Sequence, residues 1–392
     1  MAGIVPTRFE NVEKARARFG DRADRLAPYL NEVDPLADAV VATIEKMPAE
    51  GWRIFSAAAS RGIASVDGAP ESFRAFFDHV ERVPVWVDWE AIDRGGDALF
   101  RAGPLGGIVL GVRSLVLGYA SPGGNKPLVF SGRLKEQATR RLNETARFVQ
   151  ATCRRGGLHK FADGYQITLK VRLIHAQVRR MLLASGRWKS DAWGAPVNQH
   201  DMLGTSLLFS IILLQGLRQL GVRIPWEDGE RYMQLWKYSG HLIGVDSALL
   251  PSSEAEALRV GDVIAATQGE PDEDSKSLTR ALLDSSYDGA RTKAEKKNAQ
   301  RRREFAAAVC RELIGDELAD KMGVEKTTWR HLVPFMRRFV SGMEFLRESV
   351  PLGVADVPAL WAGTRYWDRV VEIGLAGATA EFGLPEKLSS AA

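Results

Sequence analysis

The chain has 392 residues, of which 45% are hydrophobic and 26% are charged, as is usual for a globular protein with a large core. Lysine and arginine number 53 against 49 aspartates and glutamates, and this small surplus argues against a nucleic-acid-binding protein. Two distant cysteines, Cys153 and Cys310, exclude a disulfide framework and a CxxC zinc site, and they favour a reducing compartment.

Helical periodicity recurs along almost the whole chain, whereas the alternation typical of strands is scarce. In chain order, the expected elements are short helices punctuated by Pro28, Pro35 and Pro48, and then helices over Gly103–Ala120, Ser131–Val149, Tyr165–Ser185, Leu203–Leu220, Asp228–Val245 and Thr327–Phe382. Asn198 or Asp201 can cap the fourth of these segments, Leu203–Leu220. The basic run Lys293–Arg303 is typical of a solvated helix face. We therefore expect one all-α domain over residues 1–392, with a core at about 103–251 and a helical extension at about 252–392.

Two apolar segments raise the question of a membrane. Gly103–Ala120 is interrupted by Arg113, and the strongly apolar part of Leu203–Leu220 is short, so both fall below the roughly 20 apolar residues of a spanning helix. We interpret both as buried core helices and expect no transmembrane segment, while a peripheral membrane contact stays open. The first 19 residues have no apolar signal region, so we expect a cytoplasmic protein.

The segment Thr168–Leu182 offers a candidate metal ligand. At helical spacing, one apolar face contains Val171, Ile174, His175, Val178 and Leu182. A neutral imidazole on such a face suits the proximal position of a haem iron, and Arg172 and Arg179 could pair with the haem carboxylates. By pattern alone, a core histidine bonded to a backbone carbonyl, with the two arginines in solvent, is the more common situation.

Three further side chains are candidates for the distal side of such a site. Arg141 and Thr145 are four residues apart on one expected helix and therefore face the same way. Together they offer a permanent charge and a hydroxyl beside bound oxygen, although each also suits an ordinary helix surface. Thr205 lies in the first turns of the apolar helix, where its hydroxyl can simply bond the carbonyl four residues earlier.

Other motifs give little support to alternative chemistries. His200 and His241 are rival metal ligands, but a helix start and a helix end explain them as capping or dipole-compensating residues. The sequence contains no GxSxG, P-loop, GxGxxG or HExxH motif, which disfavours hydrolase, kinase and nicotinamide-dependent functions.

An ordered set of motifs resembles the helical oxygenase family that includes latex-clearing protein and the mycophenolic-acid-pathway oxygenase. The matching segments are RLNET (141–145), VRLIHAQVR (171–179), WGAPVNQHDMLGT (193–205), YSGHLIGV (238–245), PSSEAEALRVGDVIAATQGEPDEDSKSL (251–278) and RELIGDELADKMG (311–323). They span about two thirds of the chain, and their order makes them far more specific than any one of them.

This resemblance implies a globin-like helical core with added N- and C-terminal helices and one haem b. By position, His175 matches the proximal iron ligand, Arg141 and Thr145 match distal residues, and Thr205 matches a threonine near the pocket. The implied activity is cleavage or oxygenation, with O2, of a C=C bond in an apolar isoprenoid or lipid-like small molecule. The resemblance reverses the preference for a structural role of His175.

The chain also departs from this family. Latex-clearing protein has a lysine immediately before the distal threonine, where this chain has Glu144, and it uses a distal glutamate as a base. Glu136 and Glu144 are the candidates for that base here. The alternative function is a non-catalytic helical module that binds lipid or protein without haem, and the oligomeric state is left open.

Overall fold

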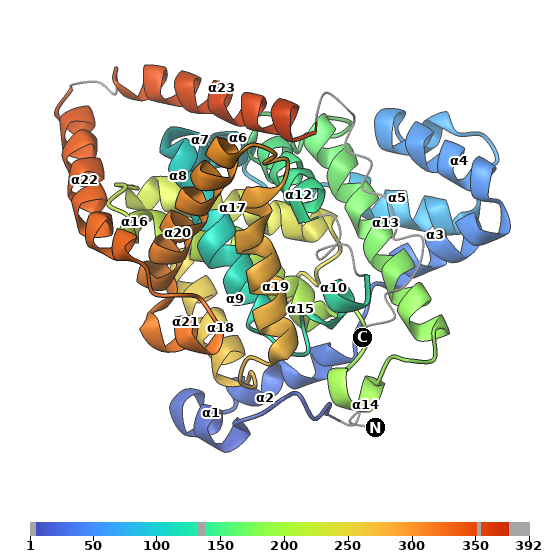
Figure 1. Ribbon diagram of the computed structural model, residues 1–392. Coiled ribbons are helices and arrows are strands. Elements are labelled where there is room, and N and C mark those ends of the chain that lie inside the picture. The colour runs from blue at the N-terminus through green and yellow to red at the C-terminus, as the bar shows by residue number, and fades with distance from the viewer. Residues whose placement is uncertain (1–4, 132–137, 351–353, 376–392) are drawn as a thin grey trace.

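The computed structural model describes residues 5–131, 138–350 and 354–375, and all regular elements within these ranges are helices (Figure 1). The predicted all-α class is therefore confirmed. Residues 132–137, which include the candidate base Glu136 and part of the expected helix 131–149, lie outside the described residues.

Short helices form the N-terminal third, as the prolines predict. They are α1 (Val12–Phe19), α2 (Arg22–Arg25), η1 (Ala27–Leu30), α3 (Pro35–Lys46), α4 (Pro48–Arg61), η2 (Ile63–Ser65) and α5 (Glu71–Glu81). Proline occupies the first position of α3, and Asp34 caps that helix by accepting a hydrogen bond from the Ala37 amide. α3 and α4 pack against the long helix α13 (Asp163–Ala184), so this N-terminal layer covers one side of it.

The first expected apolar helix, Gly103–Ala120, is present as one continuous helix over Pro104–Tyr119, but its geometry is not uniform and other short helices precede it. The chain folds as α6 (Trp89–Gly95), α7 (Asp97–Ala102), α8 (Pro104–Val109), the π-helical segment η3 (Leu110–Leu115) and α9 (Val116–Tyr119). Arg113, on η3, is buried and donates to the Leu313 carbonyl at 2.9 Å and to Gln215 and Gln219. The arginine that interrupts this apolar stretch thus joins η3 to two other helices inside the protein.

The second apolar stretch is broken at Ser210, whose φ and ψ of −100° and −97° are not helical. It forms α15 (Gln199–Phe209) and α16 (Ile211–Gln219) instead of one helix. By length and composition Gln199–Gln219 could cross a membrane, and the bent pair Trp89–Ala102 and Pro104–Tyr119 passes the same test jointly. In the apolar window of Gln199–Gln219, 56% of the residues are buried inside the protein, which fits the predicted core role.

The remaining helices enclose this centre. They are α10 (Lys126–Ser131), α12 (Ala138–Cys153), α14 (Ser190–Trp193), α17 (Trp226–Leu242), α18 (Glu254–Ala266), α19 (Glu273–Asp284), η4 (Ser285–Tyr287), α20 (Lys293–Ile314), α21 (Asp316–Lys321), η5 (Thr328–Leu332), α22 (Val333–Ser349) and α23 (Asp356–Gly374). α12 and α17 flank α13 on the side away from the N-terminal layer, and α23 lies across α7 and α12 (Figure 1). The C-terminal extension therefore packs onto the core.

Candidate active site

The middle of α13 presents His175, which is partly buried, to the interior of the protein. Burial, followed by the positive charges of Arg179 and Arg141, lowers the pKa of its imidazole to about 4, so the ring is neutral at pH 7. Within the described part of the chain, its Nδ1 atom is buried and has no hydrogen-bond partner. The bonded core histidine that the pattern alone favours is therefore not what the structure shows. A neutral imidazole with an unused nitrogen can bind a metal ion.

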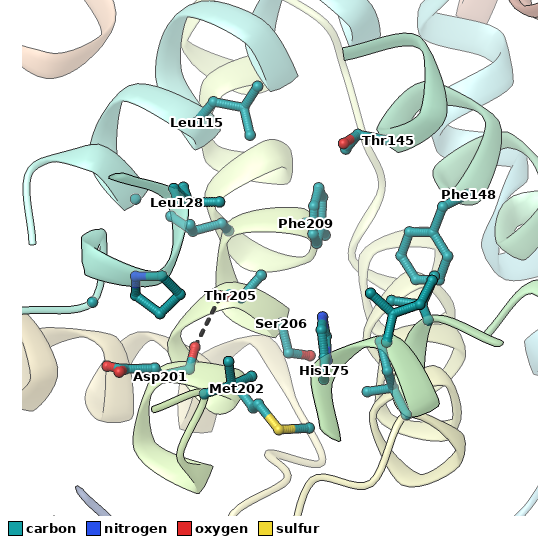
Figure 2. Close-up of a pocket in the computed structure, with 18 of the residues that line it drawn as sticks. Leu115, Leu128, Thr145, Phe148, His175, Asp201, Met202, Thr205, Ser206 and Phe209 are labelled. Atoms are coloured by element: carbon teal, nitrogen blue, oxygen red, sulfur yellow. Dashed lines mark hydrogen bonds between the residues drawn. The ribbon is translucent and has the colours of Figure 1, made fainter. Parts of the chain in front are cut away.

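His175 borders a cavity of about 330 Å³, a size in the range of ligand pockets. Figure 2 shows one ring nitrogen of His175 directed into the space below Thr145 and beside Phe209. Most of the wall is apolar, and it includes Leu115, Leu128, Leu142, Phe148, Val171, Ile174, Val178, Met202, Leu208, Phe209, Trp236 and Ile243. The helical face predicted around His175 thus lines the cavity, except for Leu182, which is fully buried in the core.

α12 brings three predicted residues to the opposite wall: Arg141, Glu144 and Thr145. The Thr145 hydroxyl donates to the Arg141 carbonyl at 3.0 Å, so its proton is used within the helix. Glu144 is 7% exposed, and its Oε1 has Arg140 Nε at 3.5 Å but no hydrogen bond among the described residues. This wall therefore holds one permanent positive charge and one carboxyl group within an otherwise apolar surface.

α15 supplies Thr205 and Asp201 to the cavity. The Thr205 hydroxyl donates to the Asp201 carbonyl at 2.9 Å (Figure 2), which is the local bond anticipated from its position in the helix. Of the two predicted capping residues, Asn198 is the cap, because its side chain accepts from the Asp201 amide at 2.9 Å. Burial opposes ionisation of Asp201, but Arg8 and His200 outweigh it and lower its pKa below the ordinary value.

Arg172 and Arg179 do not reach the cavity, so the predicted contact of these arginines with haem carboxylates is not supported. Arg172 donates to Asp34 at 2.6 and 2.9 Å, while Arg179 donates to Asp38 at 3.0 Å and to the Val197 carbonyl at 2.7 Å. On the helical wheel both lie about 40–60° from His175, on the side away from Val171 and Val178. That side of α13 faces α3, which provides the two carboxylates.

The rival histidines have other surroundings. His200 is 1% exposed, with its Nδ1 3.4 Å from Asp201 Oδ1. The His241 ring lies against the His79 ring, with centroids 4.9 Å apart, and neither of these two borders the His175 cavity. The described residues contain no group of three or more His, Cys, Asp or Glu side chains that could hold a metal ion together. The described residues therefore offer a metal ion a site with one histidine ligand, and not a cluster of several ligands.

A second cavity, of about 760 Å³, shares part of its wall with the first. The shared residues are Gly118, Gly124, Asp201, Thr205 and Leu208. Leu207, Ile211, Ile212, Leu258 and Ile264 contribute to an apolar lining, and Lys321 forms ion pairs with Glu270 and Glu317 at its border. Thr205 therefore lies between two cavities.

Several cavity residues were not predicted from the sequence. Tyr119 and Leu115 come from the glycine-rich stretch that folds as η3 and α9, and Trp236 comes from α17, where it stacks on Phe209 with ring centroids 5.3 Å apart. Phe148 could have been found, because it follows Arg141 and Thr145 at helical spacing on the same helix. Tyr119, Leu115 and Trp236 could not have been found in this way, because the sequence does not show which face of their helices lies toward the cavity.

Comparison with known proteins agrees with this architecture. Residues 100–345 match the family described as ER-bound oxygenase mpaB/B'/Rubber oxygenase, catalytic domain. The match covers more than half of the chain, so the chain belongs to this family, and the resemblance noted in the sequence is confirmed.

Individual relatives are more distant. The rubber oxygenase of Streptomyces sp. (strain K30) is 28% identical over 288 residues, which make up 68% of this chain and 66% of the relative. The chain thus spans just under two thirds of the length of that relative. The solved structure of latex clearing protein in the closed state aligns with a TM-score of 0.67 at 23% identity, over 87% of this chain and 90% of that chain. The two share a fold.

The residues of the cavity fit a haem. The donor available to iron is a neutral histidine on a rigid helix. The walls around it are largely apolar, and among the described residues Arg141 contributes a guanidinium group to the lining. Haem needs an axial nitrogen and a dry surround, and a positive group on the wall opposite that nitrogen can stabilise negative charge that develops in the cavity.

Proposed function

We propose that this chain is a haem-b-dependent oxygenase that uses O2 to cleave or oxygenate a C=C bond of an apolar isoprenoid or lipid-like small molecule. The observation that carries the proposal is His175, a neutral, partly buried imidazole that directs one ring nitrogen into an apolar cavity and whose Nδ1 has no partner among the described residues. The chain belongs to a family that is described by its oxygenases, and this membership supports oxygenation as the class of reaction.

In this proposal the haem supplies the redox chemistry with O2. His175 holds the iron and fixes the orientation of the group. Arg141 provides a permanent positive charge that stabilises negative charge developing in the cavity, and the buried carboxyl group of Glu144 gives or takes a proton. The apolar wall excludes water and holds the substrate, and Thr145 and Thr205 shape the space with hydroxyls already bonded to their own helices.

The second cavity supports an extended substrate. Its apolar lining adjoins the first cavity at Thr205 and Leu208, so one end of a long chain can lie near His175 while the remainder occupies the second cavity. A substrate that extends past Thr205 would occupy both cavities, which favours an isoprenoid or acyl chain over a compact ring.

An absorption spectrum of protein from iron-replete cells tests the assignment. We expect a Soret band that shifts on reduction with dithionite in the wild type and is lost or strongly altered in His175→Ala. His159→Ala is the matched control, because His159 bonds Asp93 at 3.0 Å away from the cavity, and its spectrum should equal that of the wild type.

Two results would remove the proposal. One is a colourless wild type that cannot be reconstituted with haem, which would favour a binding module without haem. The other is a His175→Ala protein with a full and unshifted Soret band. With haem confirmed, O2 consumption and carbonyl formation should occur with unsaturated isoprenoids and be absent with their saturated analogues.

A further inference from the structure

One face of α22 exposes a continuous row of apolar side chains. Six residues on or directly beside this helix are 41–70% exposed, and they follow one another at intervals of three or four: Leu332, Phe335, Phe339, Met343, Leu346 and Val350. At helical spacing they fall within an arc of about 80°. We call these six residues the α22 stripe. Monomeric soluble proteins rarely expose so continuous an apolar surface.

The helix is held in place with this stripe outward. Val333 is buried, and Met336 and Val340 pack against the core along the side of the helix next to the stripe. Arg347 bridges Glu344 at 3.1 Å and also pairs with Asp356 at the start of α23, and Arg223 bonds Glu348 at 2.6 Å. Figure 1 shows α22 at the outer edge of the molecule. The exposure of the stripe is therefore a property of the packed structure.

Positive charge flanks the stripe on one side. At helical spacing Arg338 falls about 100° from the middle of the stripe, whereas Arg337 falls about 160° away, on the opposite face of the helix. Arg337 and Arg338 are exposed and form no ion pair or side-chain hydrogen bond within the described ranges. Both carboxylates of α22 are already engaged by Arg347 and Arg223. On α23, Trp361 is 60% exposed and has the Arg365 guanidinium 4.6 Å from its ring. Aromatic and aliphatic side chains beside free arginines are typical of helices that lie in a membrane interface.

We propose that the α22 stripe docks this protein onto the surface of a membrane that contains anionic lipid. The apolar side chains enter the boundary between headgroups and acyl chains, and Arg338, which flanks the stripe, contacts lipid phosphates. A second copy of the chain fits less well. It would present the same arginines again, and its α22 has no free carboxylate to receive them, whereas anionic headgroups supply the missing countercharge.

Flotation with lipid vesicles tests this proposal on the full chain. The wild type should float with phosphatidylcholine vesicles that contain phosphatidylglycerol, and less with phosphatidylcholine alone. The double variant Phe335→Ser/Phe339→Ser should bind at least about tenfold more weakly, because two large apolar side chains no longer enter the interface. Arg338→Gln should lose about fivefold on the anionic vesicles only, whereas Arg337→Gln, on the opposite face of α22, should bind like the wild type.

The control is Leu183→Ser/Trp226→Ser, which removes two apolar side chains that are 51% and 69% exposed elsewhere on the surface. It should float like the wild type. A wild type that stays in solution with every vesicle overturns the proposal. Dimerisation that light scattering detects and that Phe335→Ser/Phe339→Ser abolishes would assign the stripe to a second copy instead. Neither result affects the haem proposal, because the Soret spectrum is measured without lipid.

Discussion

At the residue scale, Glu144 is the least expected group in the cavity wall. An ionised carboxylate is costly to bury without a hydrogen bond, yet Glu144 is 7% exposed and its Oε1 has no hydrogen-bond partner among the described residues. Such a group is available to exchange a proton with a molecule in the cavity. It occupies the position where the family pattern in latex-clearing protein has a lysine.

Glu144→Gln tests this role. If Glu144 transfers a proton during turnover, the amide variant should keep the haem spectrum and lose about 10²–10⁴-fold in kcat, the usual contribution of general acid–base catalysis. Steady-state O2 consumption measures the loss. Thr145→Val is the comparison, because the Thr145 hydroxyl bonds within its own helix and should contribute little. Equal activity of Glu144→Gln and the wild type would assign the proton transfer to another group.

The histidine pair on the far side of α13 predicts a pH dependence of stability. Burial, followed by the charges of His79 and Arg172, lowers the pKa of His241 to about 4, and burial also lowers the pKa of His79. An unfolded histidine titrates near pH 6.5, so between pH 6.5 and 4 the unfolded chain binds more protons than the folded one. The free energy of unfolding should therefore be highest above about pH 6.5 and fall as the pH falls toward 4.

Urea unfolding of the haem-free protein at pH 7, 6 and 5 measures this dependence. His241→Gln removes one titrating group, so its stability should fall less steeply, by up to about 1.4 kcal/mol per pH unit. Parallel curves for the wild type and the variant would show that His241 takes up its proton equally in both states.

At the scale of elements, α3 and its cap are joined to α13 by three ion pairs, two of which differ sharply in burial. Arg172 and Asp34 have side chains only 3% and 4% exposed, whereas Arg180 and Glu45 are 42% and 51% exposed. Removing one partner of a buried pair leaves an uncompensated charge, but an exposed pair contributes little. The two pairs connect the same helices, so each serves as a control for the other.

Asp34→Asn should destabilise the fold by about 3–5 kcal/mol, because it neutralises the partner of Arg172 while leaving a side chain able to cap α3. Glu45→Gln should change the free energy of unfolding by less than about 1 kcal/mol. Equilibrium urea unfolding at pH 7 compares them. The double variant Asp34→Asn/Arg172→Met should recover much of the loss, and a loss that persists would point to the shape of Asp34 instead of its charge.

The sequence predicted the helices of this region better than their contacts. The expected Tyr165–Ser185 agrees closely with α13, because periodicity and the following glycine mark it. The break at Ser210 was missed, since the apolar residues continue across it without a proline. The partners of Arg172 and Arg179 were also missed, because a helical wheel gives the angles between side chains but not which neighbour each one faces. The resemblance to a known family, rather than the wheel, made His175 the better choice of ligand.

At the scale of the whole molecule, the two adjoining cavities predict a preference for long substrates. Ile212→Trp places a large ring in the lining of the second cavity, away from His175. Turnover of a long polyunsaturated isoprenoid should fall at least about tenfold, while a substrate short enough for the first cavity should be unaffected. The ratio of kcat/KM for the two substrates measures the effect. An equal loss for both would show that long chains do not use the second cavity.

The division of α13 into two arcs has an evolutionary consequence. Val171, Ile174 and Val178 face the cavity, whereas Arg172 and Arg179 anchor the same helix to α3. Mutations on the first arc can reshape the site for new substrates without weakening the anchor, and mutations on the second can alter stability while the site keeps its lining. Substrate specificity and thermal stability can therefore evolve independently of each other through mutations on different faces of the same helix.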